Sequence, residues 1–373
     1  MAGIYIHIPF CSKRCNYCDF HFSTSLKLKS EIIESIQKEI TLKKDFFGAQ
    51  NSEIQTIYFG GGTPSILFPE ELEAIINTLK LNFEINKNIE ITLEANPENI
   101  DEFNLESWYK LGINRLSLGI QSFNNDILSL MNRSHNGFKA IESLKLIEQS
   151  PIDNYNFDLI FGSSLHNMDI LKHDIETLLA YSPNHISTYG LTIEEGTAFH
   201  NWVTEKKMPD IDQEKASEQY TFIMETLRQH GYDHYEISNF ALPKHESKHN
   251  TSYWNNKKFL GLGPSAHSYD GKHRYENIRN NSQYIQAINK NTQHYTIETL
   301  TTEQQYNEYI MTQLRKKGGI NIKEVTSLFP KFWNLKKANK FKEEGLLQIE
   351  DNQIYLTDEG KLFADSICLE LFN

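Results

Sequence analysis

The sequence contains little cysteine: four residues in 373, of which three lie within residues 11–18. The fourth, Cys368, lies near the other end of the chain. This distribution excludes a fold built on disulfides and is typical of a reducing compartment. The chain also lacks an apolar run close to the roughly 20 residues of a membrane span, and its N-terminus lacks the features of a signal peptide. We therefore expect a cytoplasmic protein with no integral membrane segment.

Positive charge is in deficit, because 37 lysines and arginines face 49 aspartates and glutamates, for a net charge of −12. Proteins that bind nucleic acid in general present a basic surface, so this balance argues against that class. The hydrophobic content of 39% and charged content of 23% are typical of a globular protein. The length suffices for one large α/β domain and a smaller one.

The most informative segment is Ile4–Phe22, where Ile4, Ile6 and Ile8 alternate as in a β-strand that Pro9 ends. Cysteines follow at once in the spacing C-x3-C-x2-C. Three thiolates on one loop can bind three corners of a [4Fe–4S] cluster, for which the usual full set is four cysteines. One iron would then stay open, as in a catalytic metal site.

A zinc site is the alternative for these cysteines, with His7 or His21 as the fourth ligand. Zinc sites usually pair cysteines as C-x2-C and close with four ligands. The observed spacing therefore favours the cluster.

Strands and helices are predicted to alternate after this loop, which is the pattern of βα units around a parallel sheet. Strands are expected over 4–8, 56–59, 89–95, 115–120, 156–161 and 185–191, and helices over 28–44, 69–81, 105–111, 139–149 and 169–180. Six such units predict an α/β fold with a partial, three-quarter (β/α)6 barrel. A helix over 213–230 and an edge strand over 234–240 are expected to follow.

We expect three parts: the partial barrel over 1–240, a linking segment over 241–299 that closes the barrel mouth, and a helix-rich domain over 300–373. In the last part, the sequence pattern predicts helices over 303–317 and 335–344, followed by a hairpin and a short helix. This order of elements resembles a winged-helix module. These helices are rich in lysine, at Lys316, Lys317, Lys336, Lys337, Lys340 and Lys342. A nucleic-acid surface is the alternative to a solvated helix face, which we favour.

Several polar residues stand near the ends of predicted strands, and barrel enzymes place their sites at that face. Gly60-Gly61-Gly62-Thr63 follows the second strand; glycines admit a ligand close to the backbone, and free N–H groups there can bind a carboxylate. Glu94 ends an apolar strand, where a carboxylate is costly without a partner. Gln121, Arg133 and Asp158 follow the same pattern. For Asp158 the alternative is a structural salt bridge to an arginine such as Arg115 or Arg133.

These motifs resemble a known family. C-x3-C-x-aromatic-C directly after a Y-x-H-x-P-F strand is similar to the radical S-adenosylmethionine (radical SAM) superfamily, and more closely to the oxygen-independent coproporphyrinogen III oxidase family. CNYCDF resembles the HemW branch, whose members are heme chaperones. In the oxidase branch a further cysteine follows the third by two positions, where this chain has Phe20. That departure favours the chaperone function, with oxidative decarboxylation of coproporphyrinogen as the alternative.

The resemblance implies a role for each matching residue. Cys11, Cys15 and Cys18 would bind the [4Fe–4S] cluster, whose open iron would be chelated by the amino and carboxylate groups of SAM. The residues implied near SAM or the cluster are Tyr5, Tyr17, Gly61, Gly62, Thr63, Glu94, Gln121, Arg133, Asp158, Ala266 and His267. For Tyr5 and Tyr17, a role in aromatic packing is the alternative.

The segment His249–Trp254, with the pattern H-N-x-x-Y-W, resembles the HemW signature. Imidazole is a common axial ligand of heme iron, so His249 is the candidate heme ligand and His245 the substitute. The alternative is that His249 makes hydrogen bonds within a loop.

The resemblance also implies partners. They are heme, heme-accepting hemoproteins of the respiratory type, and an electron donor such as a flavodoxin or ferredoxin. No nucleic-acid partner is expected.

Overall fold

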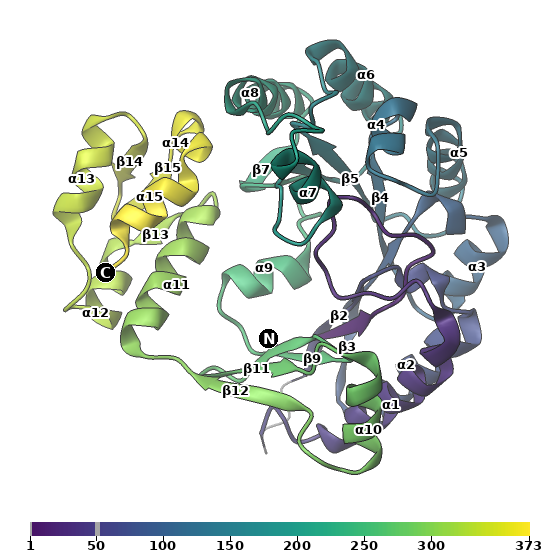
Figure 1. Cartoon of the computed structure of the whole chain (residues 1–373). Helices are drawn as coiled ribbons and strands as arrows, with labels where there is room; N and C mark the ends of the chain where they lie inside the picture. Colours follow the sequence, from purple (N-terminus) through teal and green to yellow (C-terminus); the bar gives the residue numbers. More distant parts are fainter. Residues whose placement is uncertain (1, 49–52) are drawn as a thin grey trace.

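A sheet of six parallel strands forms the centre of the protein in the computed structural model, which describes residues 2–48 and 53–373. Each strand pairs with the next along the chain, and Figure 1 shows the sheet curving into an open barrel with helices outside. The strands are β1 (Ala2–Ile8), β2 (Ile54–Gly61), β3 (Ile85–Ala95), β4 (Arg115–Gln121), β5 (Tyr155–Phe161) and β6 (His185–Gly190). The predicted partial barrel of six units is confirmed.

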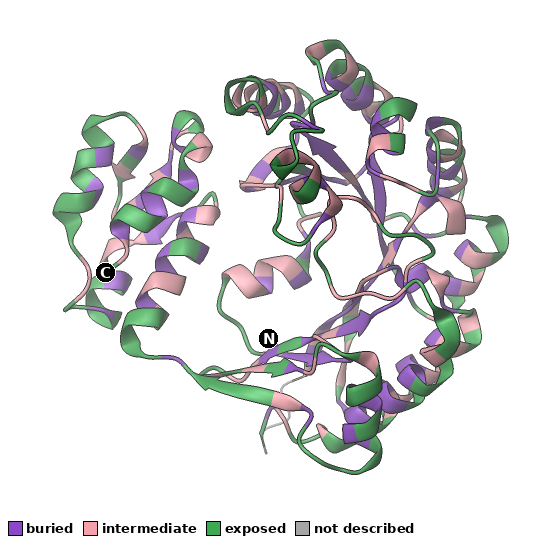
Figure 2. Ribbon diagram, in the orientation of Figure 1, coloured by how far each residue is buried: buried purple, intermediate pink, exposed green. Residues whose placement is uncertain are grey.

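Helices cover the outer face of the barrel because each carries an apolar stripe at helical spacing. In α1 the side chains of Ile32, Ile36 and Ile40 are fully buried, and Figure 2 shows the buried faces of the outer helices turned to the sheet. The helices are α1 (Lys29–Leu42), α2 (Pro69–Asn82), α3 (Glu102–Lys110), α4 (Asn125–Leu130), α5 (Gly137–Glu148), α6 (Met168–Leu179), α7 (Ala198–Thr204) and α8 (Gln213–Gln229). The short helices α4 and α7 were not predicted.

The sheet extends past the barrel at both edges. Beyond β6, where one strand was predicted over 234–240, the structure has a hairpin of β7 (Asp233–Glu236) and β8 (Asn239–Ala241), because the backbone turns at Ile237 and Ser238. Beyond β1, β9 (Phe259–Leu262) pairs in parallel with β1. It is followed by the antiparallel strands β10 (His267–Tyr269), β11 (His273–Asn277) and β12 (Tyr295–Thr299).

The segment 241–299 therefore adds strands to the sheet, together with α9 (Lys248–Trp254) and α10 (Asn281–Asn289). The limits proposed for the three domains stay predictions. Among the described residues, no helix combines the length and the apolar character that crossing a lipid bilayer requires.

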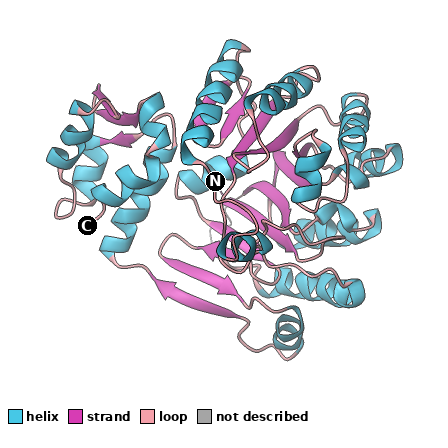
Figure 3. Cartoon of the chain, turned by 45° about the horizontal axis from the view of Figure 1, so that its top comes forward, coloured by secondary structure: helices cyan, strands magenta, loops and turns pink. Residues whose placement is uncertain are grey.

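The C-terminal residues form a second lobe with its own core, which includes Tyr306, Ile310, Phe341 and Ile367. Figure 3 shows this lobe beside the barrel, with β12 leading into it. Its elements are α11 (Thr302–Arg315), β13 (Ile320–Asn321), α12 (Ile322–Leu328), α13 (Leu335–Glu343), β14 (Leu347–Glu350), β15 (Gln353–Leu356), α14 (Asp358–Leu362) and α15 (Ala364–Leu371). The three strands pair antiparallel in the order β13-β15-β14. The two predicted helices and the hairpin are present as α11, α13 and β14–β15, whereas β13 and α12 were not predicted and two short helices, α14 and α15, stand where one was expected.

Candidate cofactor site

The C-terminal ends of the parallel strands open into a cavity of about 900 Å³. Most of the predicted site residues line it, although they come from separate loops. They are Cys11, Cys15, Tyr17, Cys18, Gly61, Gly62, Thr63, Glu94, Gln121, Arg133 and Asp158. Tyr5, His249, Ala266 and His267 do not line it.

The cysteine loop follows β1, and two backbone hydrogen bonds join its beginning to its end. The Cys11 N–H donates to the Ser23 carbonyl (3.1 Å), and the Ser23 N–H donates to the Pro9 carbonyl (2.9 Å). The three cysteines between these points are partly buried and face one cavity. The loop thus presents three thiols to a single ligand space.

The two histidines of the zinc alternative are engaged elsewhere. His7 Nε2 donates to the carbonyl of His21 (2.8 Å), and His21 Nε2 donates to Asn281 Oδ1 (2.8 Å). Neither histidine lines the cavity. The structure therefore places no predicted fourth ligand beside the three cysteines.

Arg133 lies against the cysteine loop. Its Nη1 is 3.4 Å from Cys15 Sγ, and its Nη2 donates to Asn96 Oδ1 (2.7 Å) and the Gly119 carbonyl (2.8 Å). Burial raises the pKa of Cys11 to about 11 and that of Cys18 to about 12, which favours the neutral thiols. At Cys11 the Arg133 guanidinium opposes the rise in pKa, because positive charge stabilises a thiolate.

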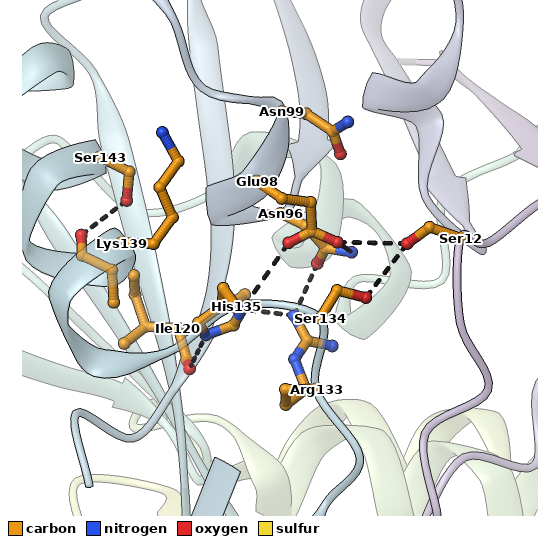
Figure 4. A network of polar contacts seen from close by, with 12 residues as sticks. Ser12, Asn96, Glu98, Asn99, Ile120, Arg133, Ser134, His135, Lys139 and Ser143 are labelled. Atoms are coloured by element: carbon orange, nitrogen blue, oxygen red, sulfur yellow. Dashed lines mark hydrogen bonds and ion pairs between the residues drawn. The ribbon is translucent and has the colours of Figure 1, made fainter. Parts of the chain in front are cut away.

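A polar network ties the same loop to the loops after β3 and β4 (Figure 4). Ser12 Oγ donates to Glu98 Oε1 (3.3 Å) and lies 3.2 Å from Ser134 Oγ. His135 Nδ1 is 3.6 Å from Glu98 Oε2, and its Nε2 donates to the Ile120 carbonyl (3.0 Å). The position of the cysteines therefore depends on two neighbouring βα loops.

The glycine loop packs directly on the cysteine loop. The Gly62 N–H donates to the Ile8 carbonyl (2.9 Å), and the Thr63 N–H donates to the Phe10 carbonyl (2.7 Å). A Cβ on Gly62 would lie 2.5 Å from the Phe10 carbonyl oxygen, and Gly61 has a φ of 106°. Only glycine fits both positions without strain.

Glu94 lies beside this loop, where its carboxylate accepts hydrogen bonds from Tyr58 Oη (2.8 Å) and the Gly61 N–H (3.2 Å). Burial raises the pKa of Glu94 to about 7, and these two donors oppose the rise. The carboxylate is therefore close to its midpoint of ionisation at neutral pH. A bound ammonium group would favour the charged form.

Asp158, on β5, accepts hydrogen bonds from Asn156 Nδ2 (2.7 Å) and Ser117 Oγ (3.3 Å). Burial raises its pKa. The alternative of a structural salt bridge is not found, since no lysine or arginine within the described residues lies within ion-pair distance of its carboxylate. The carboxylate thus stays available to the cavity.

Gln121 ends β4 with a φ of 68°, a conformation that non-glycine residues seldom adopt. Its side-chain Oε1 is buried and has no hydrogen-bond partner among the described residues. Such strain and an unpaired buried acceptor are both characteristic of functional sites. The amide is therefore positioned for a donor that arrives with a ligand.

The two tyrosines lie in different places. The Tyr17 ring borders the cavity and packs 6.5 Å from the Phe199 ring. Tyr5 lies deeper, where its hydroxyl is 3.2 Å from His7 Nδ1 and its ring stacks on Tyr58 at 6.1 Å. Packing thus accounts for Tyr5, and its contact with a cofactor stays a prediction.

Ala266 and His267 stand at the start of β10, outside the cavity lining. Ala266 is buried, and its carbonyl accepts from the Asn277 N–H (2.9 Å), whereas His267 is exposed. Their contact with SAM also stays a prediction.

His249 is buried within α9, so the H-N-x-x-Y-W motif is helical and not a loop. Its Nδ1 is 2.8 Å from Thr56 Oγ1, and its Nε2 is 2.7 Å from Tyr253 Oη. The ring stacks on Tyr58 at 5.0 Å. Both ring nitrogens are engaged, so heme ligation by His249, still a prediction, would require α9 to move. His245, the substitute ligand, is half-buried and also lies outside the cavity lining.

Replacement of His249 by leucine is expected to lower the free energy of unfolding by about 2–4 kcal/mol, because the buried Thr56 hydroxyl and the half-buried Tyr253 hydroxyl lose their partner. The measurement is urea denaturation, with His245→Leu as the control that should change stability by less than about 1 kcal/mol. A heme titration of the folded His249→Leu protein then tests ligation separately. An unchanged heme spectrum and affinity would remove His249 as the ligand.

Sequence reasoning missed two groups of cavity residues. The first lies inside the strands: Arg115, Ser117, Asn156, Ser187 and Tyr189. Polar residues two positions apart, as in Arg115-x-Ser117 and Asn156-x-Asp158, face the same side of a strand and signal a polar barrel interior. The second comes from the C-terminal lobe: Arg315, Lys361, Leu362, Phe363, Ala364, Asp365 and Ser366. No local pattern marks these residues, because only the packing of the two lobes brings them to the cavity.

Comparison with known proteins identifies the family. A family model described as the Radical SAM superfamily matches residues 5–178, and one described as the HemN C-terminal domain matches residues 300–363. The heme chaperone HemW of Bacillus subtilis is 32% identical over 380 residues, covering 98% of this chain and 98% of that protein. HemW of Synechocystis is 37% identical over 295 residues, covering 77% of this chain and 70% of that protein.

Among solved structures, coproporphyrinogen III oxidase (HemN) of Escherichia coli superposes with a TM-score of 0.85 at 20% identity, covering 100% of this chain and 90% of that one. This likeness concerns the fold alone. Near full-length similarity to HemW proteins above 30% identity, together with the radical SAM match, shows that the chain belongs to the HemW family of the radical SAM superfamily.

Proposed function

We propose that this protein is a radical-SAM-type heme chaperone, which binds a [4Fe–4S] cluster, SAM and heme and passes heme to hemoproteins. One observation carries the proposal: three cysteines, a glycine loop and two half-buried carboxylates, which belong to or follow four different strands, line one cavity. The names of the HemW relatives supply the substrate class.

The cysteine loop fits a cluster held at three corners. Cys11, Cys15 and Cys18 would each bind one iron, and no predicted fourth ligand competes for the remaining one. When bound, the cluster supplies one-electron chemistry and an open coordination position. Arg133 would offset the negative charge of the thiolates, and its buried Nε has no partner among the described residues.

The glycine loop and its neighbours fit SAM. A Cβ on Gly61 would lie 2.6 Å from the His7 ring and one on Gly62 2.5 Å from the Phe10 carbonyl oxygen, so only glycine lets this loop pack so closely while it borders the cavity. Glu94 would receive the ammonium group of SAM, and Gln121 Oε1 would accept a hydrogen bond that no protein group makes. The chain's own residues thus bind and orient the nucleotide, and the surrounding walls exclude water.

We expect SAM binding to weaken as pH falls from 7.5 to 6, by about eightfold, because Glu94 loses its charge through a raised pKa of about 7. The sign follows from the direction of that shift: the carboxylate is ionised above the raised pKa and neutral below it. Calorimetric titration of the cluster-loaded protein with SAM measures the effect. Glu94→Gln should bind SAM weakly at both pH values, and a pH profile unchanged by that substitution would remove Glu94 from this role.

Heme binding and delivery are tested directly. The cluster-loaded protein is titrated with hemin, and the complex is then mixed with an apo-hemoprotein while the absorbance spectrum is followed. Transfer of heme is expected, and absence of both binding and transfer would overturn the proposal. As part of the same proposal, the recipients are respiratory hemoproteins, and a flavodoxin or ferredoxin supplies electrons to the cluster.

The same proposal predicts no conversion of coproporphyrinogen, since Phe20 stands where the oxidase branch has a cysteine. Anaerobic incubation with SAM, reductant and coproporphyrinogen, followed by chromatography of the porphyrins, measures this. Robust formation of protoporphyrinogen would assign the chain to the enzyme function instead.

A further inference from the structure

Two exposed phenylalanines from opposite ends of the chain border the same cavity. Phe20 follows the last cysteine of the loop and is 66% exposed, and Phe363 at the corner between α14 and α15 is 49% exposed. Neither the cluster nor SAM accounts for Phe363, which lies on the C-terminal lobe. Large apolar side chains left open at a cavity indicate a ligand surface.

The backbone on both sides of Phe20 is anchored. The Asp19 carbonyl accepts a hydrogen bond from Arg279 Nη2, and the His21 carbonyl accepts one from His7 Nε2 (2.8 Å). Arg279 lies just before α10 and His7 lies on β1, and the His21 side chain also donates from Nε2 to Oδ1 of Asn281, the first residue of α10 (2.8 Å). The exposure of Phe20 is therefore built into the fold and is not the result of a loose loop.

The corner that carries Phe363 is anchored as well. Asp358 of α14 accepts two hydrogen bonds from Arg228 Nη2 of α8 (2.9 and 2.8 Å), and Lys361 Nζ lies 3.2 Å from His234 Nδ1 of β7. Figure 1 shows α14 on the side of the C-terminal lobe that faces α8. These contacts hold the corner as a wall of the cavity.

The remaining lining between these walls is mixed. Leu191, Ile237 and Leu362 add apolar surface. The charged groups at this end are Lys13, Arg315, Lys361, Asp19, Glu194 and Asp365. Arg315 and Lys361 already pair with Glu236 and Asp358. Lys13 is exposed and makes no ion pair with any described residue, so it is a cation available for a ligand carboxylate.

We propose that the outer part of the cavity, between Phe20 and the Leu362–Phe363 corner, is the binding site of the tetrapyrrole. The apolar faces of the macrocycle would contact the two phenyl rings, and a carboxylate of the ligand would meet Lys13. The inference rests on the proposed function and adds to it a location that includes the C-terminal lobe. The volume of the cavity, about 900 Å³, is at the upper end of the roughly 300–1,000 Å³ typical of ligand-binding pockets. The cavity therefore has room for a macrocycle beside a bound nucleotide.

The test uses the full-length, cluster-loaded protein and two probes, hemin and metal-free protoporphyrin. Phe363→Ala and Phe20→Ala are each expected to raise both dissociation constants by about tenfold, the equivalent of one lost aromatic contact. Phe363→Trp should retain affinity. Phe103→Ala is the matched control, because Phe103 is 67% exposed but lies outside the cavity, and its effect should stay below about twofold. Iron content is measured throughout because Phe20 adjoins the cysteines.

Any other result of these titrations would contradict the proposed tetrapyrrole-binding site. Unchanged affinity in both alanine variants would place the tetrapyrrole elsewhere and leave the proposed function intact. An equal loss in Phe103→Ala would indicate general adsorption to exposed aromatics. A loss for hemin without one for protoporphyrin would indicate an effect on iron and not on ring contact. Absence of heme binding by the unmodified protein would instead overturn the proposed function itself.

Discussion

Replacement of Cys15 by alanine is expected to abolish the iron–sulfur cluster, reducing bound iron from about four atoms per chain to near zero. The two remaining cysteines offer one ligand fewer than a three-cornered cluster needs, and Arg133 Nη1 loses the sulfur that lies 3.4 Å away. Iron and sulfide are measured after anaerobic reconstitution, together with the visible absorbance.

The matched control is Cys368→Ala, which removes a buried cysteine of the C-terminal core outside the cavity lining. This variant should lose some stability but keep its iron and sulfide. If Cys15→Ala also keeps full iron and sulfide, the assignment of the cluster ligands is wrong. Reduced SAM affinity in Cys15→Ala is expected as a secondary effect, because the open iron would no longer be present.

A Gly62→Ala substitution is expected to weaken SAM binding by about 100-fold or more, equivalent to at least about 2.7 kcal/mol. The added Cβ would lie 2.5 Å from the Phe10 carbonyl oxygen and 2.9 Å from that of Ile8. Both are backbone atoms that cannot turn aside, so the glycine loop must move away from the cysteine loop. The shift should also lower the free energy of unfolding by about 1–3 kcal/mol.

Gly318→Ala serves as its control, because a Cβ there would meet no atom within 4 Å. It should bind SAM as the unmodified protein does, in the same calorimetric titration. Normal SAM affinity in Gly62→Ala, with the cluster present, would show that the glycine loop does not contact the nucleotide.

Much of the barrel was predictable because its signals are local. Ile32, Ile36 and Ile40 recur at helical spacing and became the buried face of α1. By contrast, no strand was predicted at β10, which has three residues, or at β12, where Tyr295 and Ile297 alternate with polar residues over only five positions. In the structure β9 pairs with β1, and β10, β11 and β12 continue the sheet from β9, so their partners come from the sheet edge and not from local sequence.

The histidine motif shows a different limit. H-N-x-x-Y-W suggested a heme ligand, with hydrogen bonding within a loop as the alternative, but His249 is buried in a helix with both ring nitrogens in hydrogen bonds. Thr56 and Glu90, which hold this helix, lie on strands far away in the sequence. A histidine has the same identity whether its nitrogens are free or engaged, so only its surroundings decide what it can bind.

By itself, the sequence determined the chemistry available at one loop: three cysteines at C-x3-C-x2-C, with phenylalanine where a further cysteine stands in the related oxidases. It also determined that βα units would bring Gly61, Glu94 and Asp158 to one face. Only the tertiary structure decided that the α14–α15 corner forms a wall of the same cavity. The reason is physical: residues of one loop are close because the chain is continuous, whereas Phe20 and Phe363 share a cavity only because ion pairs and packing hold two lobes together.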